Sequence, residues 1–182
     1  MNEKSSAEDK DWVENYDHAF RERLRGTYED PKICGLVRLR CRIWLDLAMP
    51  IVERYGKEGI EIAKEARYKS AKEVAEEIAA KFGTNVQAIY RYYRDFLPWA
   101  EPTWDIYLGD LPNKMKLRAK CQVGNYWIER IKQQPECREL CWIYCAWDEE
   151  VPKYLNPKIK CKINKWIADG SPYCELEWST EE

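Results

Sequence analysis

The chain has 182 residues, of which 45% are hydrophobic and 34% charged, and a formal net charge of -2. These values are typical of one soluble globular domain that can bury a core. No apolar run approaches the roughly 18 residues of a membrane-spanning helix, and the polar, acidic N-terminus lacks the apolar segment of a secretory signal. The near-neutral charge excludes the basic footprint of a nucleic-acid-binding chain. We therefore expect a cytoplasmic protein without a membrane or nucleic-acid partner.

Eight cysteines and a single histidine, His18, limit the chemistry of any site. Without a signal sequence, the cysteines are expected to be reduced thiols rather than a disulfide framework. A nucleophile paired with histidine would have to recruit His18 from the N-terminal region, where we expect a partly exposed helix histidine. Histidine-rich metal sites are excluded. Nine Trp and twelve Tyr residues suit the wall of a pocket as well as a core.

The first third of the chain is predicted to be helical after a disordered tail over residues 1–10. A charged amphipathic helix is predicted over 11–25, and a second helix over 34–55 that Pro50 should kink or split. The apolar residues at helical spacing in this second helix are Leu36, Leu39, Ile43 and Leu47.

A third helix is predicted over residues 57–82, where Ala, Glu and Lys are abundant and Gly83 supplies a terminator. Thr84 or Asn85 can cap a further helix that runs to Pro98. Beyond Pro98 the apolar period changes from helical to alternating, which predicts strands.

Two hairpins are predicted in the second half, over residues 104–121 and 158–178, with turns at 109–114 and 168–172. Between them lie two helices, the second carrying most of the cysteines and ending near Val151. Basic residues alternate with apolar ones in the strands, which is typical of a solvated outer sheet face. The glutamates of the last strand can face the lysines of its hairpin partner across that surface.

The order of elements predicts an α+β fold, with a helical N-terminal half packed on a four-stranded antiparallel sheet. We expect a single domain over 11–182, in which 11–98 is the helical part and 99–182 the α+β part, in ββααββ order. The alternation places Cys121, Cys161 and Cys174 on the apolar sheet face, which the cysteine helix must cover.

The segment CRELCWIYCAWDEE, residues 137–150, places Cys137, Cys141 and Cys145 four apart and Asp148 three further on. On a helix these side chains form one stripe, which has three interpretations. Free cysteine packs as a small apolar side chain, and this is expected for Cys137 and Cys141, as for Cys34 and Cys41 in the second helix. A zinc site typically needs four ligands in paired CxxC units, which the sequence lacks, so Cys121, Cys145 and Cys174 remain only a geometric option for zinc.

The third interpretation is a catalytic thiol, which must ionise to act as a nucleophile. If both are buried, the negative charge of Asp148 would raise the pKa of the Cys145 thiol, which argues against a simple Cys–Asp dyad. Asp148 is better suited to orient a substrate amine or water, or to act as a general base.

Residues 121–178 resemble the family of L-2-amino-thiazoline-4-carboxylic acid hydrolases. The recurrent pattern is a strand-end Cys, a helix with Cys and then Asp, an Asn-Pro break and a closing Gly-x-x-x-Cys hairpin. The matching positions are Cys121, Cys145, Asp148, Asn156, Pro157, Gly170 and Cys174. The helical stretch 54–83 is similar in less specific residues. The closing hairpin also resembles vinyl-reductase-type ligand-binding domains.

The resemblance implies that water opens a cyclic amidine at the carbon between sulfur and nitrogen. It implies a small-molecule substrate and no cofactor, with Cys145 or Cys121 as nucleophile and Asp148 as the group that moves the proton. Trp147, Asn156 and Cys174 are the expected ligand contacts. Replacing Cys145 should abolish activity, whereas replacing Cys137 should cost little.

The sequence does not decide which of several arginines would bind a substrate carboxylate. The candidates are Arg38, Arg42, Arg67 and Arg118, the last disfavoured because it points outward. The alternative function is a non-catalytic domain of the vinyl-reductase type that binds a small ligand or zinc. A homodimer is compatible with either function.

Overall fold

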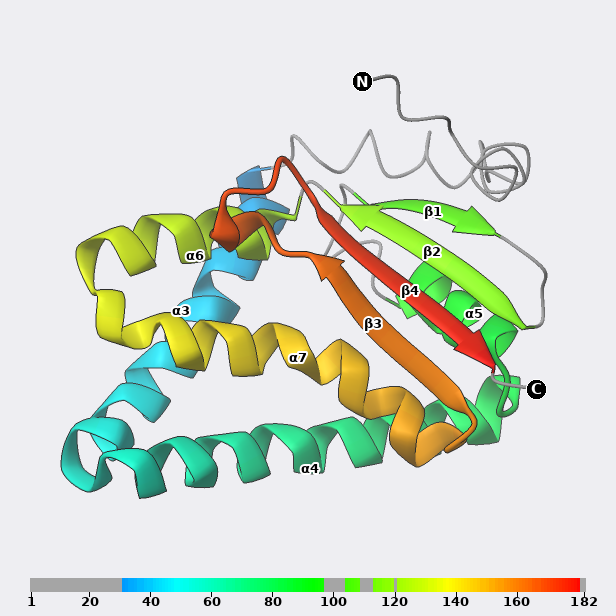
Figure 1. The fold of residues 1–182 in the computed structure, drawn as a ribbon, viewed down its shortest axis with the longest axis horizontal. Coiled ribbons are helices and arrows are strands. Elements are labelled where there is room, and N and C mark those ends of the chain that lie inside the picture. The colour runs from blue at the N-terminus through cyan, green and yellow to red at the C-terminus, as the bar shows by residue number, and fades with distance from the viewer. Residues whose placement is uncertain (1–30, 97–103, 109–112, 120, 181–182) are drawn as a thin grey trace, which may run out of the picture.

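A computed structural model describes residues 31–96, 104–108, 113–119 and 121–180. The predicted tail over 1–10, the helix over 11–25 with His18, and most of the first hairpin turn lie outside the described residues. The elements are α3 (Pro31–Tyr55), α4 (Lys57–Phe82), α5 (Val86–Phe96), β1 (Trp104–Leu108), β2 (Lys114–Ala119), α6 (Gln122–Gln133), the short 3-10 helix η1 (Pro135–Cys137), α7 (Arg138–Leu155), β3 (Ile159–Lys165), the 3-10 helix η2 (Ile167–Asp169) and β4 (Cys174–Thr180) (Figure 1).

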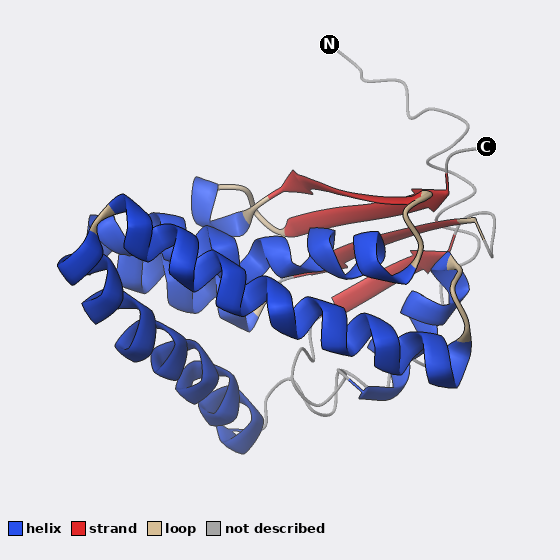
Figure 2. Ribbon diagram, turned by 90° about the horizontal axis from the view of Figure 1, so that it is seen from below, coloured by secondary structure: helices blue, strands red, loops and turns tan. Residues whose placement is uncertain are grey.

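The strands form one antiparallel sheet in the order β1-β2-β4-β3. Each predicted hairpin is present, and the pairing of β2 with β4 joins the two hairpins, with Ala119 opposite Cys174. Helices gather on one side of this sheet, as Figure 2 shows. The α+β class and the antiparallel pairing predicted from the sequence are therefore confirmed. Among the described residues, no helix is long and apolar enough to span a membrane.

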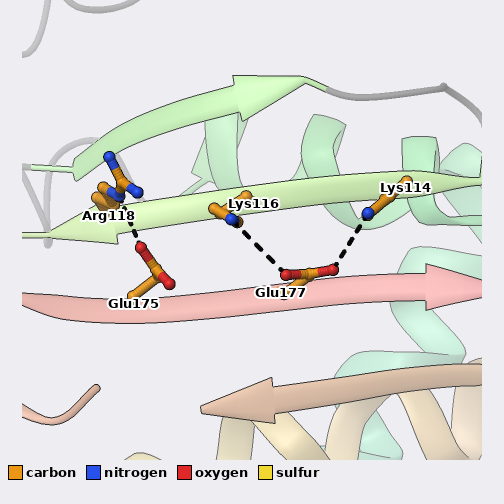
Figure 3. A network of polar contacts seen from close by, with 5 residues as sticks. All are labelled: Lys114, Lys116, Arg118, Glu175 and Glu177. Carbon is orange, nitrogen blue, oxygen red and sulfur yellow. Dashed lines mark hydrogen bonds and ion pairs between the residues drawn. The ribbon is translucent and has the colours of Figure 1, made fainter. Parts of the chain in front are cut away.

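The outer face of the sheet carries alternating charges. The register sets Glu177 opposite Lys162 of β3, as the sequence predicts, but its ion pairs are formed with β2 on the other side. The pairs are Arg118–Glu175, with 2.7 Å between Nε and Oε2, Lys114–Glu177 at 3.5 Å and Lys116–Glu177 at 3.8 Å (Figure 3). Because β4 lies between β2 and β3, its glutamates have basic neighbours on both sides.

The helix α3 buries a different stripe from the one predicted. The residues Leu36, Leu39, Ile43 and Leu47 are between 44% and 67% exposed. The buried stripe is made by Val37, Cys41, Leu45 and Ala48. Both stripes have helical spacing, so periodicity alone could not choose between them. The helix also continues through Pro50 as one element, which excludes the predicted split.

The helices α4, α5 and α7 position the site. α4 ends at Gly83, whose φ of 96° favours glycine. Asn85 then caps α5, because its Oδ1 accepts a hydrogen bond from the backbone N–H of Ala88 at 3.0 Å. α7 runs to Leu155, beyond the predicted end near Val151. α7 lies along both α4 and β3 (Figure 1) and therefore brings the cysteine stripe to the inner face of the sheet.

Candidate active site

A cavity of about 40 Å³ lies between the inner face of the sheet and the helices α5 and α7. Apolar side chains of the three strands β2, β3 and β4 form most of its wall. Four of the residues predicted for the site line this cavity together: Cys121, Cys145, Asp148 and Cys174. The alternation of the strands and the helical stripe predicted this convergence, but they also predicted Cys161 on the same sheet face, and Cys161 does not line the cavity.

Cys121 and Cys174 approach the cavity from the ends of two paired strands. β2 ends at Ala119, and Cys121 is the residue that precedes the first turn of α6. Cys174 begins β4, and its Sγ accepts a hydrogen bond from the backbone N–H of Ile167 at 3.3 Å. Because Ala119 is paired with Cys174, both thiols lie at the same end of the β2–β4 pair.

Asp148 is the carboxylate of the cavity, and Tyr93 is its hydrogen-bond partner. The Tyr93 hydroxyl donates to Asp148 Oδ1 at 2.5 Å. Burial raises the pKa of Asp148 from 3.8 to about 6, although the Tyr93 bond and the positive charges of Arg67 and Arg40 act to lower it. Burial, followed by the charge of Asp148, raises the pKa of Tyr93 well above its usual value, so this hydroxyl remains a donor at neutral pH. The carboxyl group therefore changes its charge close to neutrality.

The Cys145 thiol lies one turn from Asp148 on α7. Burial raises its pKa above the usual value, and the charges of Cys174 and Asp148 act in the same direction. The indole groups of Trp166 and Trp127 offset part of this rise, although neither indole N–H makes a hydrogen bond of normal geometry. Cys145 is therefore a protonated thiol at neutral pH, which argues against its predicted role as a thiolate nucleophile.

The other two cysteines of the stripe are core residues. Cys137 and Cys141 are completely buried, and their Sγ atoms lie 3.7 Å apart. Neither lines the cavity, so the packing predicted for both is confirmed. No group of three His, Cys, Asp or Glu side chains could hold a metal ion in the part of the chain that the structure describes. The zinc set of Cys121, Cys145 and Cys174 considered from the sequence therefore stays a prediction without support from these positions.

Two of the predicted ligand contacts have structural roles elsewhere. Trp147 points away from the cavity, because it lies two residues after Cys145 on the helix; its indole N–H donates to Ser70 Oγ at 3.2 Å. Asn156 follows the end of α7, where its side-chain amide donates to the carbonyl of Thr84 at 3.0 Å and its Oδ1 accepts from the N–H of Lys158. Neither residue lines the cavity.

The arginine candidates are now separated by their surroundings. Arg38 and Arg42 pair with exposed carboxylates on the surface, and Arg118 pairs with Glu175 on the outer sheet face. Arg67 of α4 alone among the four lies beside the cavity helix α7. Its guanidinium stacks on the rings of Tyr144 at 4.3 Å and Trp147 at 5.0 Å, and it donates to the carbonyl of Tyr144 at 3.3 Å.

Three residues of the site were not identified from the sequence. Tyr93 had no local signal, because its partner Asp148 is 55 residues away. Trp178 lies on the same strand face as Cys174, so its strand position was predictable, but its role was not. Trp166 follows β3 and also lines the cavity. The indole N–H groups of Trp166 and Trp178 make no hydrogen bond of normal geometry among the described residues, although both residues line the cavity.

The fold and the cavity together define an α+β protein with a carboxyl–hydroxyl pair beside three thiols in an internal cavity. Residues 42–178 match the family model described as L-2-amino-thiazoline-4-carboxylic acid hydrolase. The chain belongs to this family, as the resemblance in its second half predicts.

Comparison with curated proteins finds no match. Among solved structures, the chain is similar to a trafficking protein particle complex subunit 3 from Naegleria fowleri, covalently bound to palmitic acid. The two chains are 12% identical, with a TM-score of 0.49, and the match covers 80% of this chain and 95% of the other.

Proposed function

We propose that the protein is a hydrolase that opens a cyclic amidine, such as a 2-aminothiazoline carboxylate, at a non-peptide C–N bond. The observation that carries this proposal is the buried Asp148 carboxyl, with a pKa of about 6, in a cavity that has room for water. A volume of about 40 Å³ accommodates about three water molecules. Family membership supports the reaction class.

A group with a pKa near the working pH can accept a proton in one step and return it in the next. In the proposed reaction, water forms a bond to the amidine carbon while Asp148 accepts one of its protons. The bond from this carbon to the ring nitrogen then breaks, and the nitrogen leaves as an amine. Both hydrogens of the water end on the released nitrogen, the first by way of Asp148, and the oxygen remains as the new carbonyl.

Tyr93 and the two indole groups complete the proposed site. The Tyr93 hydroxyl fixes the carboxyl group through its bond to Asp148 Oδ1. The unpartnered indole N–H groups of Trp166 and Trp178 are the donors that we assign to an acceptor on the substrate. Arg67 is assigned an indirect role, because its charge lowers the pKa of Asp148 without lining the cavity.

A water nucleophile is favoured over Cys145, since burial keeps that thiol protonated. Cys121, Cys145 and Cys174 are proposed to shape the cavity and contact the substrate. A reducing, cytoplasmic compartment is part of the proposal, because none of the eight cysteines, all of which the structure describes, forms a disulfide.

The test is hydrolysis of 2-aminothiazoline-4-carboxylate by the purified protein, followed by mass spectrometry of the ring-opened product. We expect turnover that Asp148→Asn eliminates. Asp46→Asn is the matched control, because Asp46 is a surface carboxylate paired with Arg42. Turnover that survives Asp148→Asn would contradict the assignment of Asp148 as the base. A covalent adduct on a cysteine during turnover would identify a thiol, and not water, as the nucleophile.

The alternative is a ligand-binding domain without catalysis. The largely apolar wall of the cavity is the observation in its favour, because binding pockets are predominantly apolar with a few oriented polar groups. Saturable binding of the thiazoline to the wild-type protein, without any product, would favour this alternative over the hydrolase.

A further inference from the structure

A surface groove adjoins the cavity, and one side chain separates the two. The groove has a volume of about 520 Å³ and is bordered by η1, the first turns of α7 and η2. Trp166 lines both the groove and the cavity, and it is only 4% exposed. The cavity alone, at about 40 Å³, is far below the several hundred Å³ of a usual small-molecule pocket. A substrate that reaches Asp148 must therefore displace part of the wall.

Trp166 is a buried part of that wall that no hydrogen bond of normal geometry holds in place. It lies between β3 and η2, just after the register shift between Ile163 and Lys165. Its indole N–H makes no hydrogen bond of normal geometry among the described residues, so turning the ring loses only the weaker interaction of this N–H with the Cys145 thiol. The ring packs edge-on against Trp142, with 5.2 Å between centroids. An aromatic contact of this kind is a modest restraint.

Arg138 covers the groove side of the Trp166 ring through a cation–π contact. Its guanidinium carbon lies 5.4 Å from the centre of that ring, and its Nη2 pairs with Oδ1 of Asp169. Both charged side chains are about half exposed, at 51% and 49%. This side chain is a planar cation held between an aromatic face and a carboxylate, which is also how proteins recognise amidinium and guanidinium ligands.

The charge of the groove fits the same class of ligand. Three carboxylates, from Glu136, Glu139 and Asp169, line it against the single guanidinium of Arg138. Displacing Arg138 would leave an aromatic and acidic surface. A protonated cyclic amidine is planar and cationic, so it can take the place of the guanidinium beside Trp166.

We propose that the groove is the entrance site for a planar cation of the amidinium class, and that Arg138 occupies this site until the ligand displaces it and Trp166 turns aside. The proposal rests on the proposed function for the identity of the substrate. Its tests need no turnover, so it can fail or succeed separately from the hydrolase activity.

The first test measures access to the cavity through the rate at which methyl methanethiosulfonate modifies Cys145, followed by mass spectrometry. Arg138→Met removes an exposed ion pair and a cation–π contact, so we expect the rate to rise about two- to thirtyfold. Trp166→Ala should raise it at least as much. Arg38→Met is the control, because it removes an exposed pair with Glu129 elsewhere. Unchanged rates in both Arg138→Met and Trp166→Ala, or an equal rise in the control, would overturn the proposal.

The second test measures binding of benzamidine, a planar cation, by tryptophan fluorescence. Arg138→Met should bind it more tightly, by a similar factor, because the internal competitor is gone. Asp169→Asn should bind it more weakly, because the carboxylate partner is lost. No binding to the Arg138→Met protein, or equal binding by all three proteins, would overturn the groove as a cation site.

Discussion

Replacing Asp148 by asparagine should stabilise the folded protein near neutral pH while eliminating catalysis. The folded protein binds the Asp148 proton more tightly than the unfolded chain, since the pKa of this carboxyl is raised from 3.8 to about 6. Between these two values the folded state holds more protons than the unfolded state, so the free energy of unfolding falls as the pH rises. Asparagine has a similar shape, can still accept the Tyr93 hydrogen bond, and does not ionise.

The magnitude follows from the pKa difference of about 2 pH units. At about 1.4 kcal/mol for each unit, ionisation of Asp148 costs the folded state up to about 3 kcal/mol above pH 6. Asp148 is partly rather than completely buried, so solvent screening makes this an upper value.

The measurement is urea denaturation of the wild-type and Asp148→Asn proteins at a series of pH values from 4 to 8. The free energy of unfolding of the variant, relative to wild type, should increase from pH 4 to pH 6 and then stay constant. A difference that does not change with pH would refute the buried, ionising carboxyl. A difference that changes in the opposite direction would mean that the folded protein stabilises the charged form.

Two further changes test the packing around the site. A methyl group on Gly124 would lie 2.0 Å from Cγ2 of Ile167, so Gly124→Ala should lower the free energy of unfolding by about 1–3 kcal/mol. Gly35→Ala is the control and should not destabilise the fold, because no atom lies within 4 Å of its added methyl group. Equal effects of the two changes in thermal melts would count against the close contact of α6 with η2. Cys145→Ala should reduce kcat/KM about tenfold, as for a lost substrate contact, without abolishing turnover. Cys137→Ala should lower only the melting temperature. Equal and mild effects of both changes on activity would mean that the cysteine stripe serves only packing.

Residues that alternate along strands or repeat along a helix were placed correctly from the sequence. Cys121, Cys161 and Cys174 were predicted to share the sheet face that the helix with Cys145 covers, because strand parity and the helical stripe fix which face a side chain occupies. Cys121, Cys145 and Cys174 line the cavity, whereas Cys161 does not. The bounds of α4, residues 57–82, were predicted because Gly83 ends the helix by its backbone freedom.

Features that depend on long-range packing were not predictable. The helix α3 has two apolar stripes of equal spacing, and only its neighbours decide that Leu45 is buried and Leu47 exposed. The partnership of Tyr93 with Asp148 joins α5 to α7 and leaves no local signal. Trp147 was predicted as a ligand contact from its place in the motif, but helical geometry turns it toward α4.

The pH dependence of kcat/KM for thiazoline hydrolysis tests the central claim, that Asp148 acts as the base for water. The base must be ionised, so the rate should rise with pH through an apparent pKa of about 6 and then level off. Tyr93→Phe removes the hydroxyl that lowers the pKa of this carboxyl, so the rise should move to higher pH. A rise at or above the ordinary thiol pKa of about 8.5 would point to a cysteine nucleophile, whose pKa burial raises in the case of Cys145. A profile that Tyr93→Phe leaves in place would contradict the role of Asp148.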